Sequence, residues 1–205
     1  MAPARPLRDS ARMGAAQPSG TVTLVFTDIE GATRLLATLG PDEYRVGLEE
    51  HRRVVRDAFV GGYEVDCEGD SFFHAFPSAE TAADAVTEAL RALAGGAILI
   101  RVGMHTGAPT LDPPRYVGLD VHRAARIMSA AHGGQVLLSQ STRALLDPRF
   151  GCRDLGEHRL KDFPEPQRLH QLLIAGPRTP SHPWGRRAGA RCRSPPRRSS
   201  AASVR

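Results

Sequence analysis

The stretch that decides the fold is Val22-Thr23-Leu24-Val25-Phe26-Thr27-Asp28-Ile29-Glu30-Gly31. A short apolar run that is rich in β-branched residues and ends near a glycine predicts a fully buried strand over residues 22–28. A carboxylate at the end of such a strand lies at the mouth of the sheet, where a hard cation can reach it. The alternative is that Asp28 only caps the turn into a following helix. For Asp28 taken alone, the cap is the favoured interpretation.

A second carboxylate has the same setting. Asp70 follows Glu68 and Gly69 in a turn that joins two predicted strands, over residues 63–67 and 72–76. Two carboxylates on neighbouring strands make a seat for two metal ions, which in phosphate chemistry hold the attacking and leaving oxygens. The pair, rather than either aspartate alone, therefore indicates a candidate site.

Helices and strands alternate irregularly along the rest of the chain. Helical patterns follow Gly31 and cover residues 42–59, 78–93 (with Ser78 as N-cap), 119–131 and 141–146. Further strands are predicted over residues 97–105, 135–139, 154–161 and 168–174, and residues 108–117 are expected to form a loop that contains prolines. His105, at a strand end, is expected to be a hydrogen-bonded core residue. The irregular order favours an α+β fold with helices packed on a sheet over a doubly wound sheet.

The chain of 205 residues is long enough for one well-buried core. Composition predicts a folded domain over residues 21–175, between a disordered leader (1–20) and a disordered Arg/Pro/Ser-rich tail (176–205). The tail holds eight arginines and no acidic residue, so the formal net charge of +5 conceals an acidic domain. The sequence pI near 9.7 therefore does not indicate a nucleic-acid-binding fold.

Cysteine usage and hydropathy indicate the cellular compartment of the protein. The three cysteines lie far apart, in no metal-ligand spacing, and their odd number suits a reducing cytosol. The sequence has no apolar run of membrane-spanning length and no signal-peptide core, so we expect a cytoplasmic protein without a membrane partner. Nucleic-acid binding is expected only through the basic tail, where it would weaken steeply with salt.

Six short segments follow one another in a fixed order: Phe26–Gly31, Gly69–Phe72, Tyr116–Gly118, Ala124–Arg126, His132–Ser139 and Leu155–Lys161. With these segments, residues 21 to about 175 resemble the catalytic domain of the class III nucleotide cyclases, the adenylate/guanylate cyclase family. The resemblance implies a ferredoxin-like βαββαβ core with extra C-terminal strands. It also implies a head-to-tail homodimer with two composite sites between the subunits.

The chemistry that the resemblance implies is attack of the ribose 3′-hydroxyl on the α-phosphate of ATP, or of GTP as the second choice, with release of pyrophosphate. Asp28 and Asp70 would hold two Mg²⁺ or Mn²⁺ ions, and the carbonyl of Ile29 would add a ligand. His122 and Arg126 would come from the partner subunit; being four residues apart, they share one helix face. The arginine would stabilise charge that develops on the phosphates.

Three positions differ from the family pattern. His122 stands where the family has asparagine, Asp66 where adenine-selective members have lysine, and Arg115 where those members have aspartate. Asp66 and Arg115 carry charges opposite to those of the lysine and aspartate that adenine-selective members have at the same positions. This pair allows contacts to adenine, contacts to guanine, or an ion pair between the two residues that leaves the base unrecognised. By resemblance Tyr116 lines the base pocket; the alternative is that it only anchors a loop. By resemblance Lys161 reaches the triphosphate; the alternative is that it is an exposed lysine at a strand end.

The sequence leaves three hypotheses for function. The first is a nucleotide cyclase that makes a cyclic second messenger for signal transduction. The second is a pseudo-cyclase, a nucleotide-binding or dimerising regulatory module without turnover. The third assigns the function to the arginine-rich tail as a binder of nucleic acid or another anionic surface.

Overall fold

The fold is that of a computed structural model, which describes residues 15–174. Its elements in chain order are β1 (Val22–Ile29), α1 (Ala32–Leu39), α2 (Pro41–Ala58), β2 (Tyr63–Glu68), β3 (Ser71–Phe76), α3 (Ala79–Ala92), β4 (Ile100–Gly107), β5 (Thr110–Asp112), β6 (Arg115–Val117), α4 (Leu119–Ala130), β7 (Val136–Ser139), α5 (Gln140–Ala144), β8 (Cys152–His158) and β9 (Gln167–Leu172). Residues 1–14 and 175–205, which include most of the expected leader and all of the basic tail, lie outside the described part.

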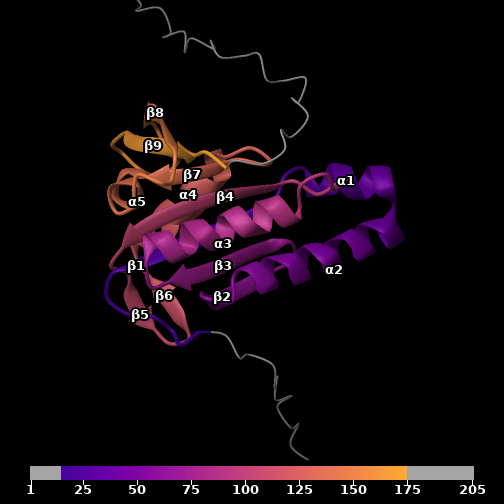
Figure 1. The fold of residues 1–205 in the computed structure, drawn as a ribbon, viewed down its shortest axis with the longest axis horizontal. Coiled ribbons are helices and arrows are strands. Elements are labelled where there is room, and N and C mark those ends of the chain that lie inside the picture. The colour runs from indigo at the N-terminus through magenta and orange to yellow at the C-terminus, as the bar shows by residue number, and fades with distance from the viewer. Residues whose placement is uncertain (1–14, 175–205) are drawn as a thin grey trace, which may run out of the picture.

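One mixed sheet forms the centre of the domain, with the strand order β2-β3-β1-β4-β7-β9-β8 (Figure 1). Neighbouring strands are antiparallel from β2 to β4, and this arrangement is the βαββαβ core expected from the sequence. The sheet then continues through β7, which runs parallel to β4, and through the antiparallel strands β9 and β8. The α+β prediction with extra C-terminal strands is confirmed.

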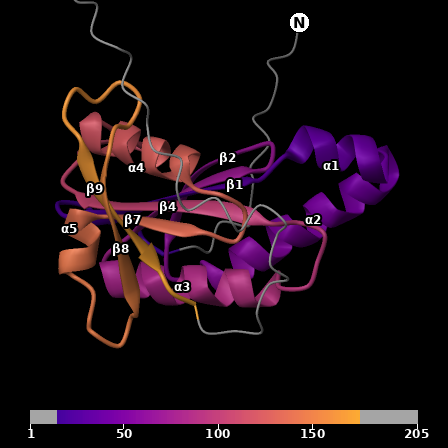
Figure 2. The same ribbon diagram turned by 90° about the horizontal axis from the view of Figure 1, so that it is seen from above.

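Helices cover both faces of the sheet, with α3 on one side and α4 on the other (Figure 2). The strand β1 serves both layers, because successive side chains point to opposite faces. Val25 and Ile29 join the core under α2 and α3. Leu24 belongs to the smaller core under α4, together with Phe73 and Ala124. Asp28 is four residues after Leu24 and therefore points to the same face of the sheet, so its carboxylate lies on the α4 face.

Two glycines allow α4 to lie directly on β4. A Cβ atom at Gly103 would be 2.2 Å from the backbone nitrogen of Met128, and one at Gly107 would be 2.4 Å from Oδ2 of Asp120. Because the start of α4 meets the end of β4, the helix runs antiparallel to the strand. Any side chain at Gly103 would push the helix off the sheet.

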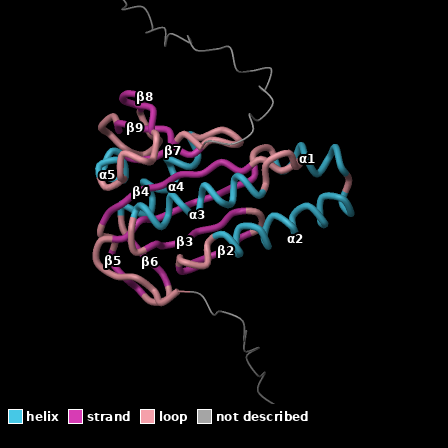
Figure 3. Tube along the Cα trace, in the orientation of Figure 1, coloured by secondary structure: helices cyan, strands magenta, loops and turns pink. Residues whose placement is uncertain are grey.

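The structure corrects the expected loop over residues 108–117. Thr110–Asp112 and Arg115–Val117 pair as a two-stranded antiparallel hairpin beside the main sheet (Figure 3). Three-residue strands around two prolines are too short to show a period-two pattern, and the buried ring of Tyr116 is what holds this hairpin to the domain. The N-cap prediction is confirmed, since Oγ of Ser78 accepts the N–H of Thr81 at 3.2 Å. Within residues 15–174, no helix is both long and apolar enough to cross a bilayer.

Candidate active site

The two predicted metal-binding aspartates lie at the same end of adjacent strands. Thr27 of β1 is opposite Phe72 of β3, which places Asp28 beside Ser71. The Ser71 hydroxyl donates a 2.7 Å hydrogen bond to Oδ1 of Asp28. Asp70 precedes Ser71 directly, so the strand register brings the two carboxylates to one corner of the sheet, as the sequence predicted for neighbouring strands.

The carboxylate of Asp70 is incompletely satisfied. Its Oδ2 atom is buried and has no hydrogen-bond partner within residues 15–174. A buried carboxylate oxygen without a protein partner is costly, and a bound cation or an ordered water is what would satisfy it. This atom therefore fits a metal ligand better than a turn cap.

Asp28 has a cationic partner that the sequence analysis missed. The side chain of Arg101 on β4 forms an ion pair with Oδ2 of Asp28, with Nε at 3.0 Å and Nη2 also in contact. The register pairs the two residues directly across the strands. The available signal was a single arginine inside the apolar run over residues 97–104.

The helix α2 supports the aspartate corner from the other face. The buried His51 donates from Nε2 to the carbonyl of Asp70 at 3.2 Å, and its ring meets Phe72 edge to face. Burial lowers the pKa of His51, which keeps the ring neutral. Burial and then the nearby Asp70 raise the pKa of Tyr44 on the same helix. His51 was also missed, because an apolar helix face gives no sign of which loop it contacts.

The donor set at this corner consists of oxygen atoms and is small. Within residues 15–174, no group of three or more His, Cys, Asp or Glu side chains is arranged to hold a metal ion. Mg²⁺ and its relatives are commonly bound by one or two carboxylates together with water and substrate phosphates. Asp28, Asp70 and the backbone carbonyl of Ile29 fit that mode of binding.

The helix α4 carries the other predicted catalytic residues on its outer face. Ala124 and Ile127 are buried against the sheet, whereas His122 is exposed and Arg126 is one-third exposed. The guanidinium of Arg126 binds Oδ2 of Asp162 through Nε at 3.1 Å and Nη2 at 2.5 Å. Asp162 was not singled out from the sequence.

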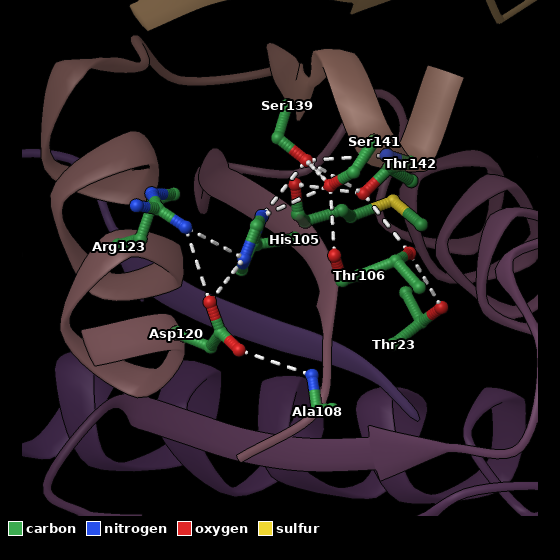
Figure 4. Close-up of polar contacts among 10 residues, drawn as sticks. Thr23, His105, Thr106, Ala108, Asp120, Arg123, Ser139, Ser141 and Thr142 are labelled. Carbon is green, nitrogen blue, oxygen red and sulfur yellow. Dashed lines mark hydrogen bonds and ion pairs between the residues drawn. The ribbon is translucent and has the colours of Figure 1, made fainter. Parts of the chain in front are cut away.

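A buried polar network fixes the beginning of α4 (Figure 4). Oδ1 of Asp120 contacts Nε2 of His105 at 3.0 Å and accepts from Arg123 at 3.1 Å, while its Oδ2 accepts the N–H of Ala108 at 3.0 Å. On the other side of the ring, Nδ1 of His105 is 2.9 Å from Oγ of Ser139. The expectation that His105 is a hydrogen-bonded core residue is confirmed.

The charges of this network are balanced. Burial lowers the pKa of His105, although the hydrogen bond with Asp120 opposes that effect. For Asp120, burial acts to raise the pKa, but the contact with His105 and the other hydrogen bonds hold it below its usual value. A neutral histidine and an ionised aspartate follow. The network ties the first turn of α4 to β4 and β7.

The predicted base-binding residues lie on β2 and β6. Asp66 and Arg115 are exposed, and within the described part of the chain they form no ion pair with each other. Tyr116 is buried, packs edge to face on Phe73, and donates its hydroxyl to the carbonyl of Pro18. Its position is that of a hairpin anchor, and contact with a base stays a prediction.

Lys161 lies exposed in the turn after β8, directly before Asp162. This turn contacts α4 through the ion pair between Asp162 and Arg126, so Lys161 is on the same side of the domain as the predicted catalytic arginine. Contact between Lys161 and a triphosphate stays a prediction.

The family model for the adenylate and guanylate cyclase catalytic domain matches residues 15–174. An uncharacterized protein of Mycobacterium tuberculosis is 36% identical over 163 residues, which cover 76% of this chain and 56% of that protein. An adenylate cyclase of Podospora anserina is 25% identical, over 76% of this chain and 10% of its own length. The chain therefore spans only about half of the mycobacterial relative, and a small part of the fungal one.

Solved structures show the same fold. Adenylate cyclases from Trypanosoma brucei, solved in their monomeric state, superpose with a TM-score of 0.70 at 28% identity, covering 80% of this chain and 93% of theirs. The adenylyl cyclase CyaB from P. aeruginosa has a TM-score of 0.64 at 23% identity, covering 80% and 99%. Together, the strand-end aspartates, the sheet order and these matches establish that the chain belongs to the adenylate and guanylate cyclase catalytic domain family.

Proposed function

We propose that this domain is a nucleotide cyclase that converts ATP, or GTP as the second choice, into a 3′,5′-cyclic nucleotide and pyrophosphate for signalling. The observation that carries the proposal is the buried, unpartnered Oδ2 of Asp70 beside Asp28 in a domain of the cyclase family. A cytoplasmic location is part of the proposal, and the free thiols of Cys67 and Cys152 support it.

Asp28, Asp70 and the carbonyl of Ile29 are the groups that would hold two Mg²⁺ or Mn²⁺ ions. When bound, such ions lower the pKa of the ribose hydroxyl and neutralise the triphosphate. The protein has to position the reacting groups and complement their charge. Arg101 suits the second task, because its guanidinium lies beside Asp28 at this corner and is a group that binds phosphate oxygens well.

The catalytic groups of α4 require a second copy of the chain. His122 and Arg126 project from the outer face of the helix, opposite the face that packs on the sheet with Asp28. Exposed apolar side chains also lie on the β5–β6 hairpin and in the first turn of α4: Leu111, Val117 and Leu119. Burying these side chains against a partner would remove apolar surface from water and bring Arg126 to the partner's aspartates. We therefore propose a homodimer with composite sites.

Base recognition would fall to Asp66 and Arg115. Their side chains are exposed and not paired with each other, which supports their availability to a base edge. Asp66 can accept from an exocyclic amino group and Arg115 can donate to a ring nitrogen or to a carbonyl oxygen. This donor and acceptor set suits both purines, and the preference for ATP rests on the family relatives.

The test is turnover of ATP and of GTP by the full chain with excess Mn²⁺, with cyclic product and pyrophosphate quantified separately. Asp70→Asn should abolish product formation, because it removes the charge from the unpartnered carboxylate without changing its shape. Asp57→Asn, a matched change of an exposed carboxylate on α2, should leave the rate unchanged. Wild-type rates in Asp70→Asn would refute the metal assignment.

A pseudo-cyclase is the second candidate, and the unusual residues at three site positions favour it. Restoring asparagine at His122, lysine at Asp66 and aspartate at Arg115 should create or raise cyclase activity if the domain has lost turnover. If the three residues are adapted to the reaction, the same changes should lower the activity or leave it unchanged. The predicted role of the basic tail stays a separate hypothesis, since it lies outside the described residues.

A further inference from the structure

The turn after β8 contacts α4 through three of its residues. Leu160 is buried against Ile127 in one apolar cluster. Asp162 binds Arg126, and the ring of Phe163 lies 5.2 Å from the guanidinium carbon of Arg123. Arg123 is itself held by Asp120 in the buried network (Figure 4). The turn is therefore fixed relative to the helix, and its carboxylate is held in place before any ligand binds.

Asp162 has an unusual backbone. Its φ of 68° is the only positive φ of a non-glycine residue within residues 15–174. The N–H of Phe163 donates to the carbonyl of Leu160 at 3.2 Å, so Asp162 occupies the third position of a four-residue turn. Turns with a left-handed residue there usually have glycine or asparagine. Glycine would adopt this backbone conformation without strain, but it has no side chain with which to bind Arg126.

The geometry of the ion pair leaves half of the guanidinium free. Both hydrogen bonds, from Nε and Nη2, go to the single atom Oδ2 of Asp162. Within residues 15–174, Nη1 of Arg126 has no hydrogen-bond partner. A guanidinium can bind a carboxylate or phosphate along the edge formed by its two Nη atoms. Asp162 binds the neighbouring edge, which Nε and Nη2 form, so it orients the arginine and leaves the Nη1–Nη2 edge available to a second anion.

We propose that Asp162 is a positioning residue for Arg126, which holds the guanidinium so that its Nη1–Nη2 edge faces the phosphates of a nucleotide bound by a partner subunit. This inference rests on the proposed function for the role of Arg126. The pair is exposed, and exposed ion pairs contribute little to stability. Its effect should therefore appear in turnover and in the order of the arginine, and not in the stability of the domain.

The first measurement is the Nε–H signal of Arg126 in the ¹H–¹⁵N NMR spectrum of the full chain at mildly acidic pH, assigned by its loss in Arg126→Lys. We expect a sharp, slowly exchanging signal in the wild type and in Asp162→Asn, whose side-chain oxygen can still accept. In Asp162→Gly the signal should broaden or disappear. An unchanged signal in Asp162→Gly would overturn the proposal, whatever the activity of the protein.

The second measurement is the kinetics of the same variants with Mn²⁺ and ATP. Asp162→Gly should lower kcat about tenfold with little change in KM, as expected when a catalytic group is misplaced. Asp162→Asn should restore most of the rate. In an Arg126→Ala background, Asp162→Gly should have no further effect, because its role would act through the arginine.

Stability separates positioning from a merely structural role. Glycine favours positive φ, so Asp162→Gly should unfold at the same urea concentration as the wild type or a higher one. Equal losses of activity in Asp162→Gly with and without Arg126, or a matching loss of stability, would overturn the positioning role. A wild type that makes no cyclic product from ATP or GTP would refute the proposed function, and the NMR signal alone would then decide whether Asp162 orients Arg126.

Discussion

His74 makes folding stability depend on pH. Its side chain is buried, its ring lies 4.9 Å from the ring of Phe59, and its Nδ1 atom is buried without a partner in the described part of the chain. Burial lowers the pKa of His74 to about 4; Glu64, 3.9 Å from Nε2, opposes this effect and Arg56 adds to it. The folded state therefore favours the neutral ring.

The size of the effect follows from the difference between the folded and unfolded pKa values. The pKa is about 4 in the folded protein and 6.5 for an unperturbed histidine, so this contribution to stability is complete above pH 6.5 and is lost as the pH drops toward 4. The full loss is about 3 kcal/mol, of which about 2 kcal/mol is lost by about pH 5. This is a large part of the stability of a small domain.

The perturbation is His74→Phe, which fills the same aromatic pocket with a group that does not titrate. The assay is urea unfolding of both proteins at about pH 7.5 and about pH 5. Comparison with the wild type isolates His74 from other buried histidines such as His51 and His105. The gap in unfolding free energy between variant and wild type should shift in favour of the variant by about 2 kcal/mol at the lower pH. The control is His122→Phe, the same substitution at an exposed position.

A gap that is the same at both pH values for His74→Phe would refute the reasoning, because the buried ring would then contribute nothing to the proton balance of unfolding. The absolute stability of the variant does not enter this test. Any packing cost of the larger phenylalanine ring applies equally at both pH values and cancels in the comparison.

Two further predictions concern how α4 is held. Gly103→Ala should destabilise the domain by about 1–3 kcal/mol in urea unfolding, because its Cβ would lie 2.2 Å from the nitrogen of Met128. The control is Gly61→Ala, whose Cβ would have no other atom within 4 Å, and equal effects of the two substitutions would contradict the close contact. Asp120→Ala should lower the free energy of unfolding by about 1–3 kcal/mol, because the Ala108 N–H and the His105 ring lose their acceptor, and Asp120→Asn should recover part of this loss. An Asp120→Ala variant as stable as the wild type would show that the network does not hold the helix.

The sequence predicted those parts of the fold whose signals are local. The β-branched run before Asp28, the Gly-Asp turn at Asp70 and the N-cap at Ser78 each act within a few residues, and all three have the expected local structure. The β5–β6 hairpin was missed, because its stability comes from the ring of Tyr116 docking on Phe73, a contact between distant segments. A three-residue strand is too short to show the alternation of apolar and polar residues from which strands are predicted.

The candidate site shows the same division between local and distant causes. Spacing alone places His122 and Arg126 on one helix face, and the buried Ala124 and Ile127 confirm which face is turned inward. The direction in which Arg126 points is set by Asp162, a residue 36 positions away in the sequence. Likewise the ion pair between Asp28 and Arg101 exists only because β4 pairs with β1. Such partners depend on strand register and turn geometry, which a single sequence does not encode locally, so they emerge only when the fold is assembled.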